Sequence, residues 1–335
     1  MWKINLVCDF RENFPTKDDH GDVLFNDHPR RASVEEIRDA LIGQGYQCEI
    51  FGGVPELAEA YTQKKVFPRY TLFVNMSDGL SQTYSRVQIP ILCDMLGVKY
   101  SGSGPFEVAL MTNKHYCKLA VSEHGILSPQ GTIANRANIQ SVLNHPWAYP
   151  LMTKPNTEGS SIGITQRNVC FSKDQLKVQL EYLLQSFSEV VVEQYISGAD
   201  VTCFVLGNPG DIVINEVLLV EHHGKRFFDR EVMEMRDHAL KKTSYVMAEE
   251  VLSNELIENV RRATLQAANA LNAHDIIRVD YRVTQDGKIY FLEANTVPRV
   301  SSTSEIGFVC QNRGLDYPHL LDQYIKSILR RINHG

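Results

Sequence analysis

Four polar residues on the two arms of a predicted β-hairpin have side chains of the kind that bind a metal ion or a phosphoryl group. An Asp-Gly pair at positions 286–287 separates two alternating apolar runs, which predicts a hairpin with a two-residue loop. Counting back from this loop places Asp280 opposite Glu293, and it places Arg278 opposite Asn295. Because side chains alternate along a strand, these four residues are expected on one face. The residues expected on the opposite face are Val279, Tyr281, Leu292 and Ala294.

The two facing carboxylates of this hairpin indicate a bound cation. Acids directly opposed on a sheet repel each other, and a cation between them is the natural compensation. Together with Asn295 they offer oxygen ligands only, a set that suits Mg²⁺ better than zinc. The alternative is that all four residues are polar side chains on the solvated face of a surface hairpin. The hairpin alone therefore suggests a metal site without establishing it.

A loop rich in small residues follows a predicted strand at positions 154–163. Its glycines and serines would let backbone amides approach a phosphate closely. Lys154 at the end of that strand and Lys114 at the start of the preceding helix could place their ammonium groups on the α or β phosphate. The Walker A pattern is absent, and an ordinary flexible turn is the alternative interpretation of the loop.

A predicted edge strand at 190–194 runs into a connector that could hold a nucleobase. Such a strand can offer backbone groups and the Glu193 carboxylate to an adenine edge, while apolar side chains sandwich the ring. A plain core strand followed by a Ser-Gly turn explains the same residues equally well. The assignment of Glu193 and Asp200 to a nucleotide site therefore depends on the residues around them.

The elements that must position these residues follow two different patterns. Strands alternate with helices through the first hundred residues, which predicts a parallel sheet with helices on both faces. A Gly-rich turn at 101–105 closes this unit, and a compact α+β region follows. We therefore expect an α/β and α+β protein of three domains, spanning residues 1–104, 105–193 and 194–335.

Several local patterns predict where elements begin and end. Ser33, with Glu36 three residues later, has the spacing of a helix capping box. We also expect one continuous helix over 107–125, a short strand near 165–168, and a polar loop over 221–243.

Composition excludes several functional classes. The 335 residues include 34 basic and 40 acidic ones, a formal charge of −6, so the chain has no general attraction for nucleic acid. The seven cysteines are scattered singly, unlike a disulfide framework or a zinc cage. The first apolar run, at 4–8, is too short for a signal-peptide core or a membrane span. We expect a cytoplasmic protein whose partners include neither nucleic acid nor a membrane.

Five motifs, taken in chain order, resemble the ATP-grasp superfamily and, within it, the D-alanine–D-alanine ligase-like group. They are 96–103, Asn113-Lys114 with Lys118, Lys154-Pro155 with 158–163, 192–194, and 278–280 with 293–296. The resemblance implies a three-domain ATP-grasp fold with an N-terminal Rossmann-like parallel-sheet domain. It also implies ATP and Mg²⁺ as cofactors, small acid and amino-acid substrates and, as is common in the group, a homodimer.

The resemblance also implies roles for individual residues. The residues implied in ATP binding are Lys114, Lys154, Glu158, Ser160, Ser161, Glu193, Gln194, Ile196 and Asp200. The lysines would hold the phosphates, the segment 193–196 would meet the adenine, and Asp200 would bind the ribose. The implied ligands of two Mg²⁺ ions, for which Mn²⁺ could substitute, are Asp280, Glu293 and Asn295. The catalytic candidates are Arg278, Ser160 and Arg299.

The region expected to bind the first substrate departs from the group's pattern. Residues 9–31 lack the Gly-rich turn and the ammonium-binding Glu that D-alanine–D-alanine ligases carry there, and they offer His28, Arg30 and Arg31 instead. Arg299 stands where the group has a glycine of the oxyanion hole. It could supply a charged donor or bind an extra carboxylate on a substrate, whereas the resemblance places Arg278 beside the transferred phosphoryl group and the acyl oxygen. The alternative is that Arg30, Arg31 and Arg299 are solvated surface charges.

Two further positions bear on the second substrate. Ser304 matches the serine that binds the carboxylate of this substrate in the group. A loop at 227–234 presents Met233 and Glu234 where those ligases carry a Lys-Tyr pair. The acceptor is therefore expected to be an amino acid, and the first substrate is not expected to be D-alanine.

The implied reaction is phosphorylation of a carboxylate by ATP, followed by attack of an amine on the acyl phosphate. Our leading hypothesis is an ADP-forming ligase of specialised metabolism that joins a small acid to an amino acid. Examples are the coupling of an amino acid to a mycosporine-like acid and the formation of a dipeptide. The alternatives are a D-alanine–D-alanine ligase of cell-wall synthesis with an altered pocket, and a non-catalytic nucleotide-binding protein.

Overall fold

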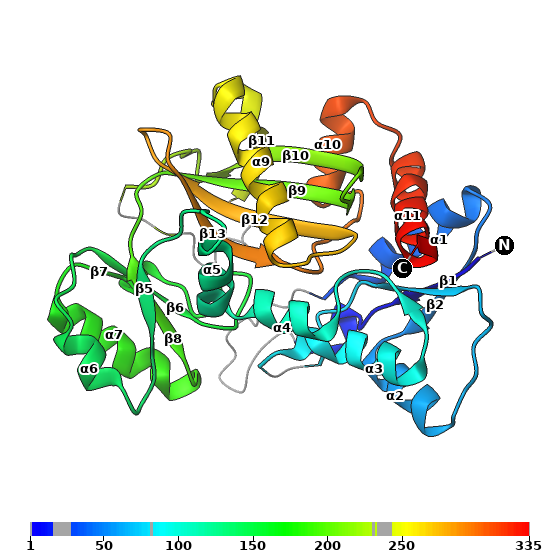
Figure 1. The fold of residues 1–335 in the computed structure, drawn as a ribbon, viewed down its shortest axis with the longest axis horizontal. Helices are drawn as coiled ribbons and strands as arrows, with labels where there is room; N and C mark the ends of the chain where they lie inside the picture. The colour runs from blue at the N-terminus through cyan, green and yellow to red at the C-terminus, as the bar shows by residue number, and fades with distance from the viewer. Residues whose placement is uncertain (1, 16–27, 81–82, 230–231, 233–242, 335) are drawn as a thin grey trace.

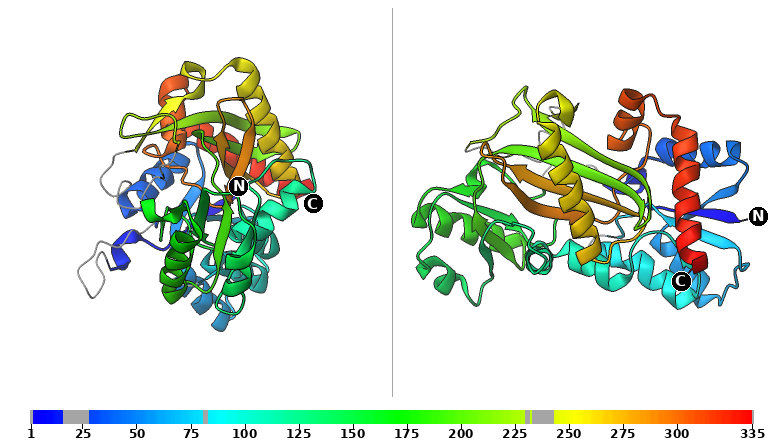
Figure 2. Two further views of the ribbon diagram at one scale, coloured as in Figure 1. Left: turned by 90° about the vertical axis from the view of Figure 1, so that its left-hand side faces the viewer. Right: turned by 45° about the horizontal axis from the view of Figure 1, so that its top comes forward.

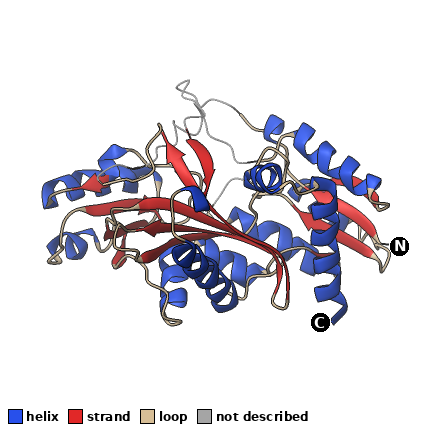
Figure 3. Cartoon of the chain, turned by 90° about the horizontal axis from the view of Figure 1, so that it is seen from above, coloured by secondary structure: helices blue, strands red, loops and turns tan. Residues whose placement is uncertain are grey.

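The strands of the protein form three sheets within one elongated molecule (Figures 1 and 3). The computed structural model describes residues 2–15, 28–80, 83–229, 232 and 243–334. One sheet is parallel and two are antiparallel, which confirms the expected combination of α/β and α+β architecture. None of the helices in these ranges combines the length and the apolar character needed to cross a membrane.

The first sheet is parallel and has helices on both faces, as its sequence pattern predicts. Its strands, in spatial order, are β2 (Gln47–Gly52), β1 (Lys3–Val7), β3 (Thr71–Asn75) and β4 (Lys99–Tyr100). Helix α1 (Arg31–Gly43) packs on one face, while α2 (Val54–Thr62) and α3 (Gln88–Leu96) pack on the other. Residues 4–7 of the central strand are all buried, as expected for a strand covered from two sides.

The second sheet is antiparallel and has an apolar layer of helices on one face. Its strands, in spatial order, are β5 (Gly131–Ala134), β8 (Val190–Gln194), β6 (Leu151–Pro155) and β7 (Val169–Cys170). Helices α6 (Ile139–Asn144) and α7 (Lys173–Ser186) cover that face with leucines and valines. The opposite face presents Met152 and Lys154 to a cavity, so this sheet is free to form one wall of a site.

The third sheet is the longest and lies between the other two (Figures 1 and 2). Its antiparallel strands, in spatial order, are β11 (Thr243–Met247), β10 (Asp211–His222), β9 (Ala199–Asn208), β12 (Ile276–Val283) and β13 (Ile289–Asn295). Helices α4 (Pro105–Thr112), α5 (Lys114–Ser122) and α9 (Asn254–Ala270) pack in one apolar cluster with this sheet. Helices α10 (Glu305–Arg313) and α11 (Tyr317–His334) share a second cluster with the sheet and with α1. The C-terminal helix therefore connects the third sheet to the first.

The hairpin formed by β12 and β13 keeps the predicted residue pairs but reaches them differently. Its loop closes through hydrogen bonds from the Thr284 N–H to the Lys288 carbonyl (2.9 Å) and from the Gly287 N–H to the Thr284 carbonyl (3.0 Å). Three residues therefore form the loop, and Gly287, at φ 80°, adopts the left-handed conformation that this loop type requires. The expectation of a two-residue loop was wrong by one position.

A β-bulge restores the register before the hairpin reaches the site. Tyr281 faces Phe291, whereas Asp280 faces Glu293, so Leu292 is an extra residue on β13. Arg278 then faces Asn295, as predicted. Because of the bulge, Leu292 lines the cavity and does not join the core on the other face, where the alternation had placed it.

Other elements differ from expectation for identifiable local reasons. Helix α1 begins at Arg31, and its first free N–H donates to the Glu12 carboxylate (3.2 and 3.3 Å), so the predicted Ser33 cap does not form. The expected helix over 107–125 is divided at Asn113, whose side chain accepts the Tyr116 N–H (3.0 Å) and caps α5.

Three segments were assigned to the wrong class or missed. The strand expected near 165–168 is a 3-10 turn, η3 (Gln166–Asn168). The end of the predicted polar loop contributes β11, which pairs with β10 from Leu218↔Met247 to His222↔Thr243. Helix α10 was also not expected. The remaining 3-10 turns are η1 (Arg11–Asn13), η2 (Ser85–Val87) and η4 (Ala248–Glu250).

Candidate functional site

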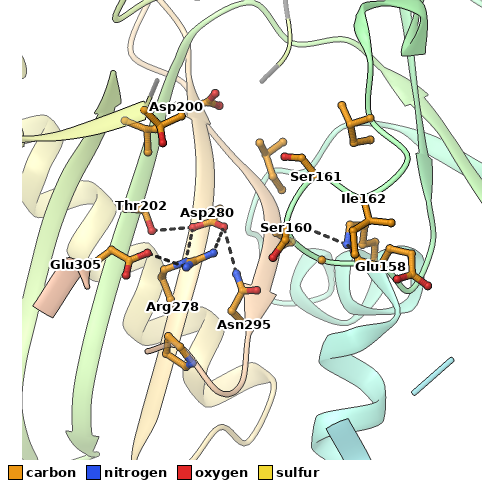
Figure 4. A pocket seen from close by; sticks show the side chains of 18 of the residues that line it. Glu158, Ser160, Ser161, Ile162, Asp200, Thr202, Arg278, Asp280, Asn295 and Glu305 are labelled. Atoms are coloured by element: carbon orange, nitrogen blue, oxygen red, sulfur yellow. Dashed lines mark hydrogen bonds and ion pairs between the residues drawn. The ribbon is translucent and has the colours of Figure 1, made fainter. Parts of the chain in front are cut away.

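A large cavity of about 370 Å³ lies where the second and third sheets face each other. Figure 4 shows one wall, formed by β9, β12 and β13, opposite the Ser160–Ile162 loop. The predicted site residues that line it are Lys114, Lys154, Glu158, Ser160, Ser161, Asp200, Arg278, Asp280, Glu293, Asn295, Arg299 and Ser304. The fold thus brings together residues that are up to 190 positions apart in the sequence.

Asp280 is fixed by three neighbouring side chains on this wall (Figure 4). Thr202, its register partner on β9, donates its hydroxyl to Oδ1 (2.7 Å). Arg278 donates to both carboxylate oxygens, Nε to Oδ1 (3.1 Å) and Nη2 to Oδ2 (3.0 Å), and Asn295 Nδ2 donates to Oδ2 (3.1 Å). Burial raises the pKa of Asp280, and the Arg278 guanidinium opposes that rise. The carboxylate is thus held in one orientation toward the cavity.

Arg278 is held from its other side by a residue that sequence reasoning missed. Its Nη1 donates to Glu305 Oε1 (2.9 Å), and the Tyr245 hydroxyl donates to the same oxygen (2.8 Å). Glu305 is buried at the start of α10, and Tyr245 lies on β11. Neither element was predicted, so the sequence pattern gave no reason to look there. Arg278 therefore bridges two carboxylates, which fixes its guanidinium plane.

The second carboxylate of the facing pair, Glu293, has a different partner. Lys114, at the first position of α5, places Nζ 3.0 Å from Glu293 Oε2 and also donates to the Glu158 carbonyl. Burial by itself would raise the pKa of Glu293, but the ammonium groups of Lys114 and Lys154 outweigh it and lower that pKa. Glu293 is thus ionised at neutral pH, and Lys114 ties it to the phosphate-loop candidate.

A buried carboxylate shared by two lysines lies below the cavity. Glu193 is 1% exposed, and its two oxygens contact different ammonium groups, Lys118 Nζ on Oε2 and Lys154 Nζ on Oε1 (3.0 Å). Burial by itself would raise the pKa of Glu193, but the two ammonium groups lower it. The carboxylate expected to meet an adenine edge therefore fixes Lys154 at the cavity wall.

The wall that carries Asp280 and Glu293 is the acidic wall of the cavity. The Ser160–Ile162 loop opposite it has a strained backbone. Ser160 and Ser161 adopt φ values of 52° and 58°, in the left-handed region that non-glycine residues rarely occupy. Gly159 precedes them beside Arg86, where a Cβ atom would lie 2.9 Å from a guanidinium nitrogen. Such strain is concentrated at ligand-binding loops, which supports the interpretation of this loop as functional.

A smaller cavity, about 30 Å³, adjoins the large one beside β8 and its connector. The predicted residues that line it are Lys154, Glu193, Gln194 and Ile196. Met152 on β6 and Leu292 at the bulge of β13 line both cavities, and sequence reasoning found neither as a site residue. Asp200 lies at the edge of the large cavity, where Arg282 Nε holds it at 3.0 Å.

The structure separates the arginines that were predicted to bind substrate. Arg299 lines the large cavity and a third one of about 110 Å³, and Arg30 lines only that third cavity. Arg31 lines none of these three cavities, because its guanidinium lies over the Phe10 ring at 3.9 Å, so its expected contact with substrate has no support here. Ser304 lines the large cavity while donating to the carbonyls of Arg299 (3.0 Å) and Ser301 (2.7 Å).

Met233 and Glu234, the residues noted in place of a Lys-Tyr pair, lie outside the described residues.

The oxygen ligands on the acidic wall suit a hard divalent cation. In the described part of the chain no three His, Cys, Asp or Glu side chains are placed to hold a metal together. A cation here would rely on Asp280, Glu293 and the amide oxygen of Asn295, which line one wall. Mg²⁺ commonly takes few protein carboxylates and completes its shell with phosphate and water oxygens. The donor set therefore fits Mg²⁺ bound together with a nucleotide.

Comparison with protein families and curated proteins finds the same relatives throughout. The family model described as D-ala D-ala ligase C-terminus matches residues 115–326. The D-alanine–D-alanine ligase of Bacillus anthracis is 30% identical over 240 residues, 71% of this chain and 73% of that protein. The ligase of Acetivibrio thermocellus is 27% identical over 252 residues, 72% of this chain and 64% of that longer protein.

Solved structures resemble the whole fold. The D-alanine–D-alanine ligase of Bacillus anthracis complexed with ATP superimposes with a TM-score of 0.70 over all of both chains, at 21% identity. The VanG D-Ala:D-Ser ligase of Enterococcus faecalis gives a TM-score of 0.71, covering 98% of this chain and 99% of that one, at 20% identity. At these identities the likeness concerns the fold.

Proposed function

Since the chain belongs to the D-alanine–D-alanine ligase family of ADP-forming ATP-grasp enzymes, which make C–N bonds, we propose that it joins a small carboxylic acid to the amine of an amino acid. The observation that carries this proposal is the acidic wall of the large cavity. Two facing carboxylates and a clamped arginine lie opposite a loop of small residues, with two lysines between them. That arrangement suits the transfer of a phosphoryl group to a carboxylate.

The proposed reaction has two steps. In the first, a carboxylate oxygen of the acid attacks the γ phosphorus of ATP, the bond to the β-phosphate oxygen breaks, and ADP leaves. In the second, the amine attacks the acyl carbon, loses a proton, and expels inorganic phosphate to leave an amide. Phosphorylation is needed because a free carboxylate would have to expel oxide, a very poor leaving group. Closure of the loops around the cavity would keep water from the acyl phosphate.

Each charged group of the wall has a task in this scheme. Lys114 and Lys154 hold ATP phosphates, and Glu193 serves them by fixing Lys154 in place. Asp280, Glu293 and Asn295 would hold Mg²⁺, two ions in the family pattern, and the metal would neutralise charge on the phosphates. Arg278 stabilises the charge that develops on the transferred phosphoryl group and the acyl oxygen.

The small cavity beside β8 is the proposed adenine site. Met152 from β6 and Leu292 from β13 both line it, and apolar side chains of this kind can contact the faces of a flat ring. Gln194 and Ile196 offer backbone groups to the edge of the base, and Asp200 binds the ribose. Ser160 and Ser161 belong to the loop over the phosphates.

The identity of the two substrates is the finer part of the proposal. Ser304 would bind the carboxylate of the acceptor amino acid, and Arg299 and Arg30 belong to the side of the acid. The names of the relatives favour an alternative in which both substrates are D-alanine. We also propose a homodimer in the cytoplasm, an expectation that rests on the family and that sedimentation and cell fractionation would test.

The proposal is tested by measuring ADP release with Mg²⁺ over paired acids and amines, with D-alanine alone as one of the pairs. Glu293→Gln should lower turnover by at least 1000-fold. Its matched control is Asp286→Asn, an amide substitution on the same hairpin at an exposed loop position, and it should change turnover less than twofold. If no pair stimulates ADP release although ATP binds, the protein is a nucleotide-binding protein and the ligase proposal fails.

A further inference from the structure

The third cavity, about 110 Å³, opens beside the large one and is the feature that the reaction scheme has not used. Its walls come from the segment before α1, the first turns of α1, the end of β3, and the segment 297–303. The residues that line both cavities are Asp78, Val297, Pro298, Arg299 and Thr303. A substrate whose reacting group lies by Arg278 can therefore extend past Arg299 into this space.

Positive charge predominates among the described residues that line the third cavity. Arg11, Arg30 and Arg299 contribute guanidinium groups from three different segments. The single carboxylate among those residues is Asp78, and Arg86 Nε already engages it at 2.7 Å. Three guanidinium groups thus line a small space, and two of them, those of Arg11 and Arg299, have other partners in the chain.

The charge of this cavity does not depend on histidine protonation. His28 also lines it, with its ring stacked on Phe14 at 3.9 Å. Burial lowers the pKa of His28; the carboxylates of Asp78 and Asp9 oppose this shift, and the guanidinium groups of Arg299 and Arg86 add to it. The imidazole is therefore neutral near pH 7, and the cations among the described lining residues are the three guanidinium groups.

Ser33 adds a hydroxyl group to the same wall. It lies in the first turn of α1, where the predicted cap does not form, and its side chain lines the cavity. Arg30, the residue that precedes the helix, has no ion pair among the described residues. Guanidinium and hydroxyl donors around a small space are the groups that recognise a carboxylate or phosphate oxygen.

We propose that the third cavity receives the far end of the acid substrate and that this end carries a second anionic group, a carboxylate or a phosphonate. This inference rests on the proposed function, because it takes the reacting carboxylate to lie by Arg278. It assigns the acid to the class of dianionic acids. An acid with an ammonium group at that end, such as an ω-amino acid, is repelled by the same arginines.

Four acids of similar length distinguish the possibilities. Succinate carries a second carboxylate, 3-phosphonopropionate a phosphonate, butyrate a methyl group and 4-aminobutyrate an ammonium group. Binding is measured as the shift in thermal midpoint on titration with each acid, in the presence of Mg²⁺ and a non-hydrolysable ATP analogue. We expect one or both dianions to bind at least tenfold more tightly than butyrate, and 4-aminobutyrate to bind most weakly.

Arg30 and Arg31 supply a matched pair of variants. Arg30→Gln should lower the preference for the better dianion over butyrate at least tenfold, and Arg299→Gln should do the same. Arg31→Gln removes an identical charge one position away, outside the cavity, and should leave the preference within twofold. Native thermal midpoints in the absence of acid show whether each variant is folded.

Two results would overturn the inference: butyrate or 4-aminobutyrate binding as tightly as the dianions, or Arg30→Gln behaving like Arg31→Gln. Failure of the proposed function gives a different result. In that case the dianions bind in the expected order, yet no acid and amine pair releases ADP.

Discussion

The carboxylate shared by two lysines allows a quantitative prediction about how Lys154 is held at the site. Glu193 is 1% exposed and Lys118 is 4% exposed, so neither charge can turn to water. Lys118→Met keeps most of the side-chain volume and removes only the ammonium group. Removing one member of a buried ion pair usually destabilises a protein by about 3–5 kcal/mol. Because Lys154 remains 3.0 Å from the other oxygen of Glu193, we expect the lower end, about 3 kcal/mol.

Glu193→Gln should be more destabilising than Lys118→Met. It leaves the buried Lys118 ammonium without an anion and places it near the Lys154 ammonium, so we expect about 5 kcal/mol. The double variant Lys118→Met/Glu193→Gln removes both charges of this pair, so neither substitution leaves the other residue with an unpaired charge. Its loss should be about 5–6 kcal/mol rather than the sum of about 8 kcal/mol, a coupling of about 2–3 kcal/mol.

Urea denaturation of the wild type and the three variants measures this cycle. The pKa of Glu193 is lowered in the folded state, so its stabilising contribution is complete above the ordinary carboxylate pKa and is lost as the pH falls through the lowered value. The difference between wild type and Glu193→Gln should therefore shrink on acidification. Losses that add within about 0.5 kcal/mol would refute the reasoning, since independent sites add that closely.

Three further predictions concern the large cavity. Glu305→Gln frees the Arg278 guanidinium on one side and should lower kcat about 10- to 100-fold while KM for ATP stays within threefold; an unchanged kcat would remove Glu305 from the positioning of Arg278. Leu292→Ala removes one apolar side of the proposed adenine site and should raise KM for ATP about tenfold, whereas the exposed Leu315→Ala should leave it unchanged; equal effects would place adenine elsewhere. Removing divalent metal with EDTA should abolish ADP release, and Mg²⁺ or Mn²⁺ should restore it; undiminished release without metal would contradict the acidic-wall assignment.

Much of the fold follows from local patterns that the sequence states plainly. Strand β8 begins and ends at the predicted residues, because its apolar run is clear and turn residues flank it. The parallel first sheet was also predictable, since strands and helices alternate through it. The boundaries of the three domains stay a prediction. Helix α11, at the end of the chain, packs against α1 of the first sheet, which lies almost 300 residues earlier in the sequence.

The pairing of Asp280 with Glu293 was predicted, although the loop that was meant to fix it was not. The three-residue loop and the bulge at Leu292 are each one residue from the expected geometry, and the two shifts cancel at the site. Alternation of apolar and polar residues cannot reveal a bulge, because an extra residue shifts which side chains face the cavity and leaves no mark in the sequence itself. Leu292 was therefore assigned to the wrong face.

The residues that sequence reasoning missed share a physical cause. Glu305 and Tyr245 lie on α10 and β11, short elements whose sequences are polar or irregular and which form because they pack on the third sheet. Lys118 was noted only as part of a motif, because its buried pairing with Glu193 joins residues 75 positions apart. Contacts of that kind depend on tertiary packing, and no local pattern in the chain encodes them.

The central claim, transfer of a phosphoryl group from ATP to the acid carboxylate, is tested most directly by an isotope measurement. The acid that supports ADP release is labelled with ¹⁸O in its reacting carboxylate, and the products are examined by mass spectrometry. The account predicts one labelled oxygen in each inorganic phosphate released and none in ADP, because the carboxylate oxygen that attacks phosphorus leaves with the phosphate. Labelled AMP, or inorganic phosphate without label, would contradict the account.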